Sequence, residues 1–160
     1  MPLSELRQER AGSPRGLRRL LLRAPIFVYR ARLGFLLGHR FSMLEHTGRR
    51  TGRRRRTVLE IVAEHDDAVY VAAGWGSSAQ WLQNIRSDPE VTVHLGVRRF
   101  RTTAVELRPG EAADVLSEYA ADHPRTLNRL AAFMLGDPGD STSEQIDRLA
   151  RAVPLVRLPT

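Results

Sequence analysis

The stretch Thr57–Ala73, TVLEIVAEHDDAVYVAA, decides the fold of this 160-residue chain. Two runs rich in apolar and β-branched residues, Thr57–Glu64 and Ala68–Ala73, lie on either side of the polar turn His65–Asp67. Such runs around a short polar turn are typical of a β-hairpin. The sequence therefore predicts two antiparallel strands here, and the rest of the chain can be interpreted outward from them.

An arginine-rich loop precedes this hairpin. Its sequence is HTGRRTGRRRRT, residues 46–57, with six arginines among the eight positions 49–56. Arginine does not lose its proton, so burying one without a partner is very costly. Gly48 and Gly52 allow tight turns in which N–H groups and guanidinium groups can converge on one anion. The alternative interpretation is a solvated basic loop between two strands.

Further strands and helices are predicted on both sides. Phe41–Glu45 is expected to be a strand that enters the arginine loop, and Ser78–Arg86 a short helix with Ser78 as its N-cap. Glu90–Leu95 alternates apolar and polar residues and precedes a turn. The remaining expected elements are a partner strand, three helices and a closing strand, at Arg99–Arg108, Glu111–His123, Thr126–Leu135, Thr142–Ala152 and Leu155–Leu158.

This pattern of hairpins and helices favours an α+β fold, a small antiparallel β-barrel with peripheral helices. No strand is followed by G-x-G-x-x-G, so a dinucleotide-binding sheet is not expected. Residues 39–160 are expected to form the barrel domain, and residues 1–38 a basic tail with an amphipathic helix. That helix, Leu17–Gly38, is too charged to span a membrane, so it either covers the core or lies on an anionic membrane surface.

The charge of the chain is concentrated at its N-terminal end. Residues 1–56 carry a net charge of +12 and residues 57–160 a net charge of −5, and every basic residue is arginine. Without lysine or cysteine, Schiff-base catalysis, disulfides and thiolate chemistry are excluded. A cationic end of this kind suits a polyanionic small molecule, a nucleic acid or an anionic membrane.

Catalytic side chains are not evident in the sequence. The five histidines lack metal-ligand spacing and G-x-S-x-G is absent, so neither a metal site nor a hydrolase is expected. A chain without evident catalytic side chains can still be an enzyme if a bound cofactor supplies the chemistry. The Gly74-Trp75-Gly76 loop could receive a flat heterocycle or a phosphate, or it could be a tight turn with Trp75 packed on the core.

The order of these motifs resembles a known family. Thr47-Gly48-Arg49-Arg50-Thr51-Gly52-x-x-Arg55 is followed by an apolar strand, Ala72-Ala73-Gly74-Trp75-Gly76, Trp81-x-x-Asn84 and Asp88-Pro89. Over residues 40–108 the chain is similar to the deazaflavin-dependent nitroreductase family. The resemblance implies a split antiparallel β-barrel like that of proteins that bind flavin mononucleotide (FMN). It also implies coenzyme F420, an 8-hydroxy-5-deazaflavin with an anionic phosphodiester and glutamate tail.

The resemblance implies three groups of coenzyme-binding residues. The phosphate and tail would be held by Arg49, Arg50, Thr51, Gly52, Arg53, Arg54 and Arg55. The deazaflavin ring would be flanked by Met43, Leu44, Glu45, Leu59, Glu60, Ile61 and Val62. Its other side would be held by Val71, Ala72, Ala73, Gly74 and Trp75. Trp81 and Asn84 are expected to be structural supports.

The implied reaction is hydride transfer from reduced coenzyme F420 to an electron-poor small molecule such as a quinone or nitroaromatic. The alternatives are an FMN-binding split barrel and a nucleic-acid-binding basic protein, although the basic run lacks the interleaved aromatic residues of a nucleic-acid site. We expect no nucleic-acid partner and a cytoplasmic location. A peripheral contact with anionic membrane through the N-terminal helix is a further hypothesis.

Overall fold

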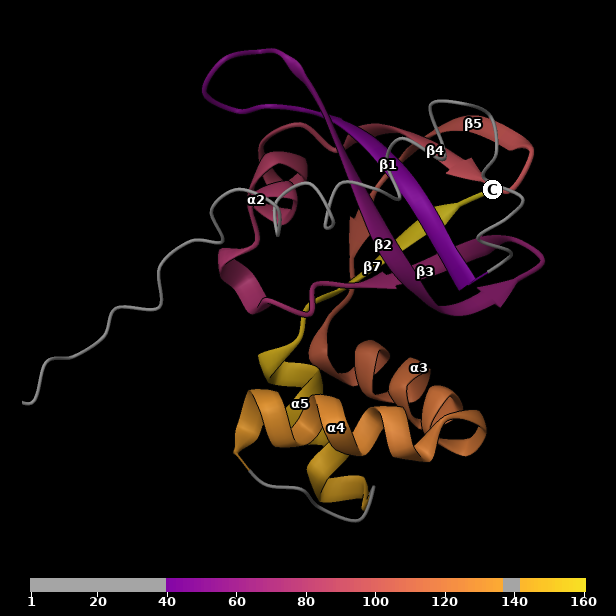
Figure 1. Ribbon diagram of the computed structural model, residues 1–160, viewed down its shortest axis with the longest axis vertical. Helices are drawn as coiled ribbons and strands as arrows, with labels where there is room; N and C mark the ends of the chain where they lie inside the picture. The colour runs from indigo at the N-terminus through magenta and orange to yellow at the C-terminus, as the bar shows by residue number, and fades with distance from the viewer. Residues whose placement is uncertain (1–39, 137–141) are drawn as a thin grey trace, which may run out of the picture.

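The computed structural model describes residues 40–136 and 142–160. In these residues seven antiparallel strands form one sheet in the order β5-β4-β1-β2-β3-β7-β6, and the sheet curls into a half-barrel (Figure 1). This confirms the predicted split antiparallel barrel. The strands are β1 (Phe41–Thr47), β2 (Arg54–His65), β3 (Ala68–Ala72), β4 (Glu90–Leu95), β5 (Arg98–Thr103), β6 (Val105–Glu106) and β7 (Leu155–Pro159). The predicted N-terminal helix and tail lie outside the described residues.

The helices gather in two places around the sheet. Three of them pack together at one end of the sheet, and α2 lies apart, beside the arginine loop (Figure 1). They are α2 (Gln80–Ser87), α3 (Pro109–Asp122), α4 (Pro124–Leu135) and α5 (Ser143–Ala152), and a 3-10 helix, η2 (Gly76–Ser78), precedes α2. The loop and α2 therefore approach each other on one side of the half-barrel.

The deciding hairpin forms as predicted, between β2 and β3. However, β2 begins at Arg54, so the last three arginines of the run belong to a strand and not to the loop. They pair with β1, where Arg54 lies opposite Thr47 and Arg56 opposite Glu45. Ladder hydrogen bonds and the pairing of opposite charges across the two strands extend the sheet into the basic run.

Two predicted boundaries were wrong. The expected strand Arg99–Arg108 is two strands, because β5 pairs with β4 and β6 pairs with β7 on the far edge of the sheet. The chain crosses between them at Ala104, whose N–H donates to the carbonyl of Pro89. The N-cap of α2 is Ala79 and not Ser78, whose hydroxyl donates to the carbonyl of Trp75 and stabilises the preceding turn.

The core consists of two clusters. Inward-facing residues of the sheet, among them Val91, Val93 and Leu95 of β4, pack against Trp81, Leu82 and Ile85 of α2. The second cluster lies between α3, α4, α5 and the adjoining strands. The apolar face predicted for Glu90–Leu95 is thereby confirmed. This apolar face of β4 anchors α2 to the interior of the half-barrel. Helix α2 in turn forms one wall of the site described below.

The core contains the buried hydroxyl group of Ser42, whose removal should stabilise the fold. Ser42 is fully buried on β1, and among the described residues its Oγ is the only buried side-chain nitrogen or oxygen without a hydrogen-bond partner. An unsatisfied buried hydroxyl destabilises the fold, so we expect Ser42→Ala to raise the free energy of unfolding by about 1 kcal/mol. Unfolding in guanidinium chloride measures this, with Ser117→Ala at an exposed position of α3 as the control. A loss of stability in Ser42→Ala would contradict the assignment.

Candidate functional site

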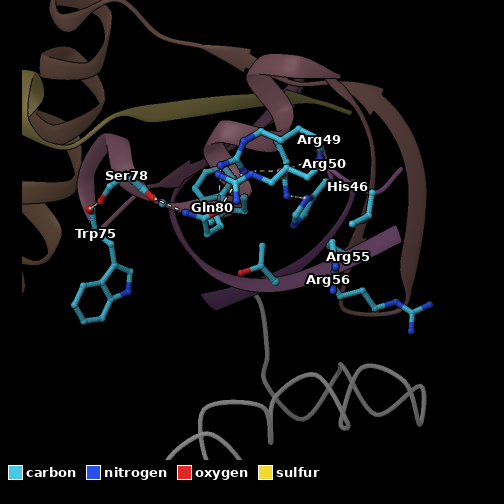
Figure 2. A pocket seen from close by; sticks show the side chains of 14 residues that line it. His46, Arg49, Arg50, Arg55, Arg56, Trp75, Ser78 and Gln80 are labelled. Carbon is cyan, nitrogen blue, oxygen red and sulfur yellow. Dashed lines mark hydrogen bonds between the residues drawn. The ribbon is translucent and has the colours of Figure 1, made fainter. Parts of the chain in front are cut away.

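A cationic cavity of about 700 Å³ lies between the arginine loop, the start of β2 and the η2–α2 segment. Figure 2 shows Trp75 on one side of the view and Arg55 and Arg56 on the other, with Gln80 between them. The size is that of a typical site for a small organic ligand. The cavity is lined by His46, Gly48, Arg49, Arg50, Thr51, Arg55, Arg56, Thr57, Trp75, Ser78, Ala79, Gln80, Trp81 and Asn84.

Backbone hydrogen bonds close the loop tightly. The N–H of Gly48 donates to the carbonyl of Arg53, and the N–H groups of Thr51 and Gly52 donate to the carbonyl of Gly48, at 2.8–3.2 Å. Gly52 has a φ of +64°, which favours glycine. At Gly48 a Cβ atom would lie 3.2 Å from the carbonyl oxygen of Arg53. The turn that presents the arginines therefore favours glycine at both positions of the motif.

Asn84 of α2 connects the arginine loop to this helix through hydrogen bonds. Its Oδ1 accepts hydrogen bonds from the backbone N–H of Arg49 at 3.1 Å and from Nη1 of the same residue at 3.0 Å. The Arg49 guanidinium also donates twice to Oε1 of Gln80, at 3.2 Å. Since Gln80 and Asn84 are four residues apart, they share one face of α2. Arg49 therefore positions the loop as well as carrying charge.

The arginines differ in how far they are neutralised. The side chains of Arg50 and Arg55 line the cavity and have no ion-pair or hydrogen-bond partner within residues 40–136 and 142–160. Arg54 and Arg56 instead lie 3.0 and 3.6 Å from the carboxylate of Glu45. The uncompensated positive charge of the cavity therefore comes from Arg50 and Arg55, together with Arg49, whose partners Gln80 and Asn84 are neutral amides.

Glu45 forms a buried charge cluster beneath the loop. It is 5% exposed, and besides the two arginines it receives a hydrogen bond from Nε2 of His94 at 2.6 Å. Burial alone would raise the pKa of Glu45, but the hydrogen bonds from His94 and Arg54 and the charge of Arg56 hold it below its usual value. Glu45 therefore remains a carboxylate that joins β1 to β2 and β4.

The other end of the cavity is aromatic. Trp75 is 76% exposed, which excludes the alternative in which it packs on the core, and its ring meets Phe133 of α4 edge to face at 5.8 Å. Trp81 and Ala79 form a buried apolar wall beside it. An exposed indole next to uncompensated arginines is suited to a ligand with a flat ring and an anionic tail.

The structure brings together only some of the predicted site residues. Those that line the cavity are Arg49, Arg50, Thr51, Arg55 and Trp75. Glu45 and Arg54 line a smaller cavity, of about 120 Å³, which His46 also borders. Glu60, Ile61 and Val62 line a third cavity beside α3. The residues outside all three cavities are Met43, Leu44, Leu59, Val71 and Ala73 in the interior, and Gly52, Arg53, Ala72 and Gly74 elsewhere.

Sequence reasoning missed part of the cavity wall. His46, Arg56 and Thr57 face it from the strands, and Ser78, Ala79 and Gln80 from the η2–α2 segment. The spacing of Gln80 and Asn84 on one helix face was the signal that could have indicated the second group. No cluster of metal-ligating side chains occurs in the described part of the chain. There is likewise no helix among these residues that could cross a bilayer.

The half-barrel and the cavity define a class, the small split-barrel proteins with a cationic ligand site. The chain belongs to the F420H(2)-dependent quinone reductase family, whose model matches residues 21–129. It is 34% identical over 97 residues to the F420H(2)-dependent quinone reductase of Mycobacterium tuberculosis, and equally to a counterpart from Mycobacterium bovis. Each alignment covers 56% of this chain and 64% of the relative, slightly less than two thirds.

Solved structures support the same fold at lower identity. A structure described as an F420-H2 dependent reductase, FDR-A, has a TM-score of 0.52 and 20% identity, over 74% of this chain and 93% of its own. General stress protein 26 from Bacillus anthracis has a TM-score of 0.51 and 16% identity, over 82% of this chain and 89% of its own. At these identities the similarity shows the split-barrel fold alone.

Proposed function

We propose that this protein is an oxidoreductase that transfers hydride from reduced coenzyme F420 to an electron-poor acceptor of the quinone type. The observation that carries the proposal is the cationic cavity, in which Arg50 and Arg55 lack counter-ions at one end and Trp75 is exposed at the other. Family membership supports the same coenzyme.

The lining residues fit the two parts of this coenzyme. Its phosphate and glutamate carboxylates are the anions that guanidinium groups bind most strongly, through charge-assisted hydrogen bonds. Its flat ring suits the apolar wall of Trp75, Ala79 and Trp81. This assignment keeps Trp75 beside the ring and replaces the predicted residues of β1, β2 and β3 with Ala79 and Trp81.

The protein residues would bind and orient, while the deazaflavin, when bound, supplies the hydride. Arg50 and Arg55 would hold the tail, and Arg49 would keep the loop against α2 through Asn84 and Gln80. The aromatic wall would exclude water from one side of the ring. Holding two reactants in a productive geometry is a large part of catalysis in such sites.

The direct test is an equilibrium titration of the purified protein with coenzyme F420, followed by stopped-flow oxidation of the reduced coenzyme with a soluble naphthoquinone. We expect saturable binding at micromolar concentrations and quinone-dependent oxidation. Because the tail is bound through charges, the affinity should fall as the salt concentration rises. A preparation that binds FMN and not F420 would contradict the proposal.

A further inference from the structure

The amide orientation of Asn84 is determined by its neighbours. Asn84 is 6% exposed, and its two polar atoms face Arg49 on one side and His46 on the other. Both groups of Arg49 are N–H donors, so the atom that faces them must be the carbonyl oxygen Oδ1. The amide nitrogen Nδ2 therefore faces Nδ1 of His46, at 3.1 Å.

This orientation sets the tautomer of His46. An amide nitrogen only donates, so Nδ1 of His46 must hold a lone pair and Nε2 must carry the ring proton. Burial and the nearby charge of Arg55 lower the pKa of His46 to about 4. The imidazole is therefore neutral at physiological pH, with its N–H at Nε2.

His46 is 5% exposed and lines the large cavity, and its Nε2 atom is not fully buried. No hydrogen bond to it occurs within the described residues, and it is not among their buried unpartnered atoms. His46 lies opposite Arg55, and Leu44, two residues earlier, lies opposite Thr57. Arg55 and Thr57 line the large cavity, so His46 projects to the same face, where Figure 2 shows its ring close to Arg49 and Arg50.

Charged groups surround His46 from every adjoining element. On its cavity side these are Arg49 and Arg50 of the loop and Arg55 of β2. Across β1 are Glu45 with its partner His94 of β4. The smaller cavity, which His46 also borders, adds Arg54, Asp88, Glu90 and Arg101. The smaller cavity has three acids, Glu45 included, against two arginines, whereas the larger cavity is positive, which suits a neutral donor aimed at a ligand oxygen.

We infer that His46 is a ligand-binding residue whose Nε2–H donates a hydrogen bond to an oxygen of the bound coenzyme, with its tautomer set by the Arg49–Asn84 hydrogen bonds. The inference rests on the proposed function. It adds a neutral, directional donor to a site otherwise made of charges. Asn84 is then a positioning residue that acts on the ligand through His46 as well as through the loop.

The first experiment measures the tautomer without any ligand. Nitrogen-15 NMR of the imidazole at pH 7 should show Nε2 protonated and Nδ1 unprotonated in the wild-type protein. In Asn84→Asp the carboxylate would keep both contacts to Arg49 but would accept a proton from His46. The proton should then move to Nδ1, and the His46 pKa should rise. A wild-type ring protonated at Nδ1, or at both nitrogens, would overturn the inference.

The second experiment compares two neutral variants of His46. The amide of Asn lies two bonds from Cβ, like Nδ1 of histidine, and the amide of Gln lies three bonds away, like Nε2. His46→Gln should therefore keep the donor to the ligand, whereas His46→Asn should keep only the contact with Asn84. We expect F420 affinity within about threefold of wild type in His46→Gln and about tenfold weaker in His46→Asn.

The outcomes distinguish this inference from the proposed function. Equal F420 affinity in the two variants would contradict the inferred hydrogen bond from His46 but not the proposed function. If the wild-type protein did not bind the coenzyme, both the proposed function and the His46 contact would be contradicted, whichever tautomer the ring adopts. Circular dichroism of both variants confirms that a weaker affinity is not caused by unfolding. The affinity of His46→Gln relative to wild type should also stay constant from pH 6 to pH 8, because neither side chain titrates there.

Discussion

Replacing both Arg50 and Arg55 with alanine is expected to weaken coenzyme F420 binding by about 2–4 kcal/mol, or roughly 30- to 1,000-fold. These two arginines line the cavity and have no counter-ion in the described part of the chain. Their charge is therefore available to a ligand, and its removal takes away charge-assisted hydrogen bonds without disturbing an internal ion pair. Isothermal titration calorimetry of the variant and the wild type gives the difference directly.

Arg53 provides the matched control. It belongs to the same loop, is exposed, and does not line the cavity. Arg53→Ala removes one charge from the same basic run, where the double variant removes two, so it should weaken binding only through long-range electrostatics, by less than about fivefold at physiological salt. If Arg53→Ala weakened binding as much as the double variant, the site would be a diffuse basic surface and not the cavity.

The second large effect is expected on stability. Glu45→Gln should lower the free energy of unfolding by about 2–3 kcal/mol at pH 7, since it leaves His94, Arg54 and Arg56 around a neutral amide. We place the value below that of a fully buried pair because the Arg54 side chain is 63% exposed and can be rehydrated. Guanidinium unfolding measures the loss.

An exposed ion pair is the control for Glu45. Glu106→Gln breaks the contact between Glu106 and Arg86, whose side chains are both about one third exposed, and should cost less than about 1 kcal/mol. A similar loss in both variants would show that the burial of Glu45 has no special effect. An unchanged stability in Glu45→Gln would contradict the charge cluster itself.

The pH dependence of stability should separate Glu45 from His46. The folded-state pKa of Glu45 is lowered, so its contribution is present above its ordinary pKa of 4.5 and is lost as the pH falls below that value. The pKa of His46 falls from 6.5 to about 4, so between these values the unfolded chain binds the proton more readily. The free energy of unfolding should therefore begin to fall as the pH drops below 6.5. His46→Asn should abolish the part of this fall that occurs between pH 6.5 and about pH 4. A loss unchanged in His46→Asn would contradict this assignment.

Much of the fold could be predicted because its signals are local. The turn His65–Asp67 between two β-rich runs specified the central hairpin, and the alternation in Glu90–Leu95 specified which face is buried. Pairing partners were harder to predict. Nothing in Arg99–Arg108 showed that its two halves join opposite edges of the sheet, because that depends on where β7 inserts.

The site could be predicted only in part for a related reason. The arginine loop and Trp75 were identified from motifs, and both meet at the cavity. The residues expected to flank the ring in β1 and β2 were chosen as continuous runs. A strand sends alternate side chains to opposite faces, so Met43 and Glu45 lie away from the cavity that His46 of the same strand lines.

The sequence by itself determined the antiparallel strands, the tight glycine turns and the surplus of arginine, because backbone propensity and charge are properties of neighbouring residues. Only the tertiary structure decided which arginines remain without a counter-ion. Glu45 pairs with Arg54 and Arg56, whereas Arg49 meets only the neutral amides of Asn84 and Gln80, through contacts between strands and a helix that the sequence separates. Electrostatic compensation depends on distance in space, and folding alone sets that distance.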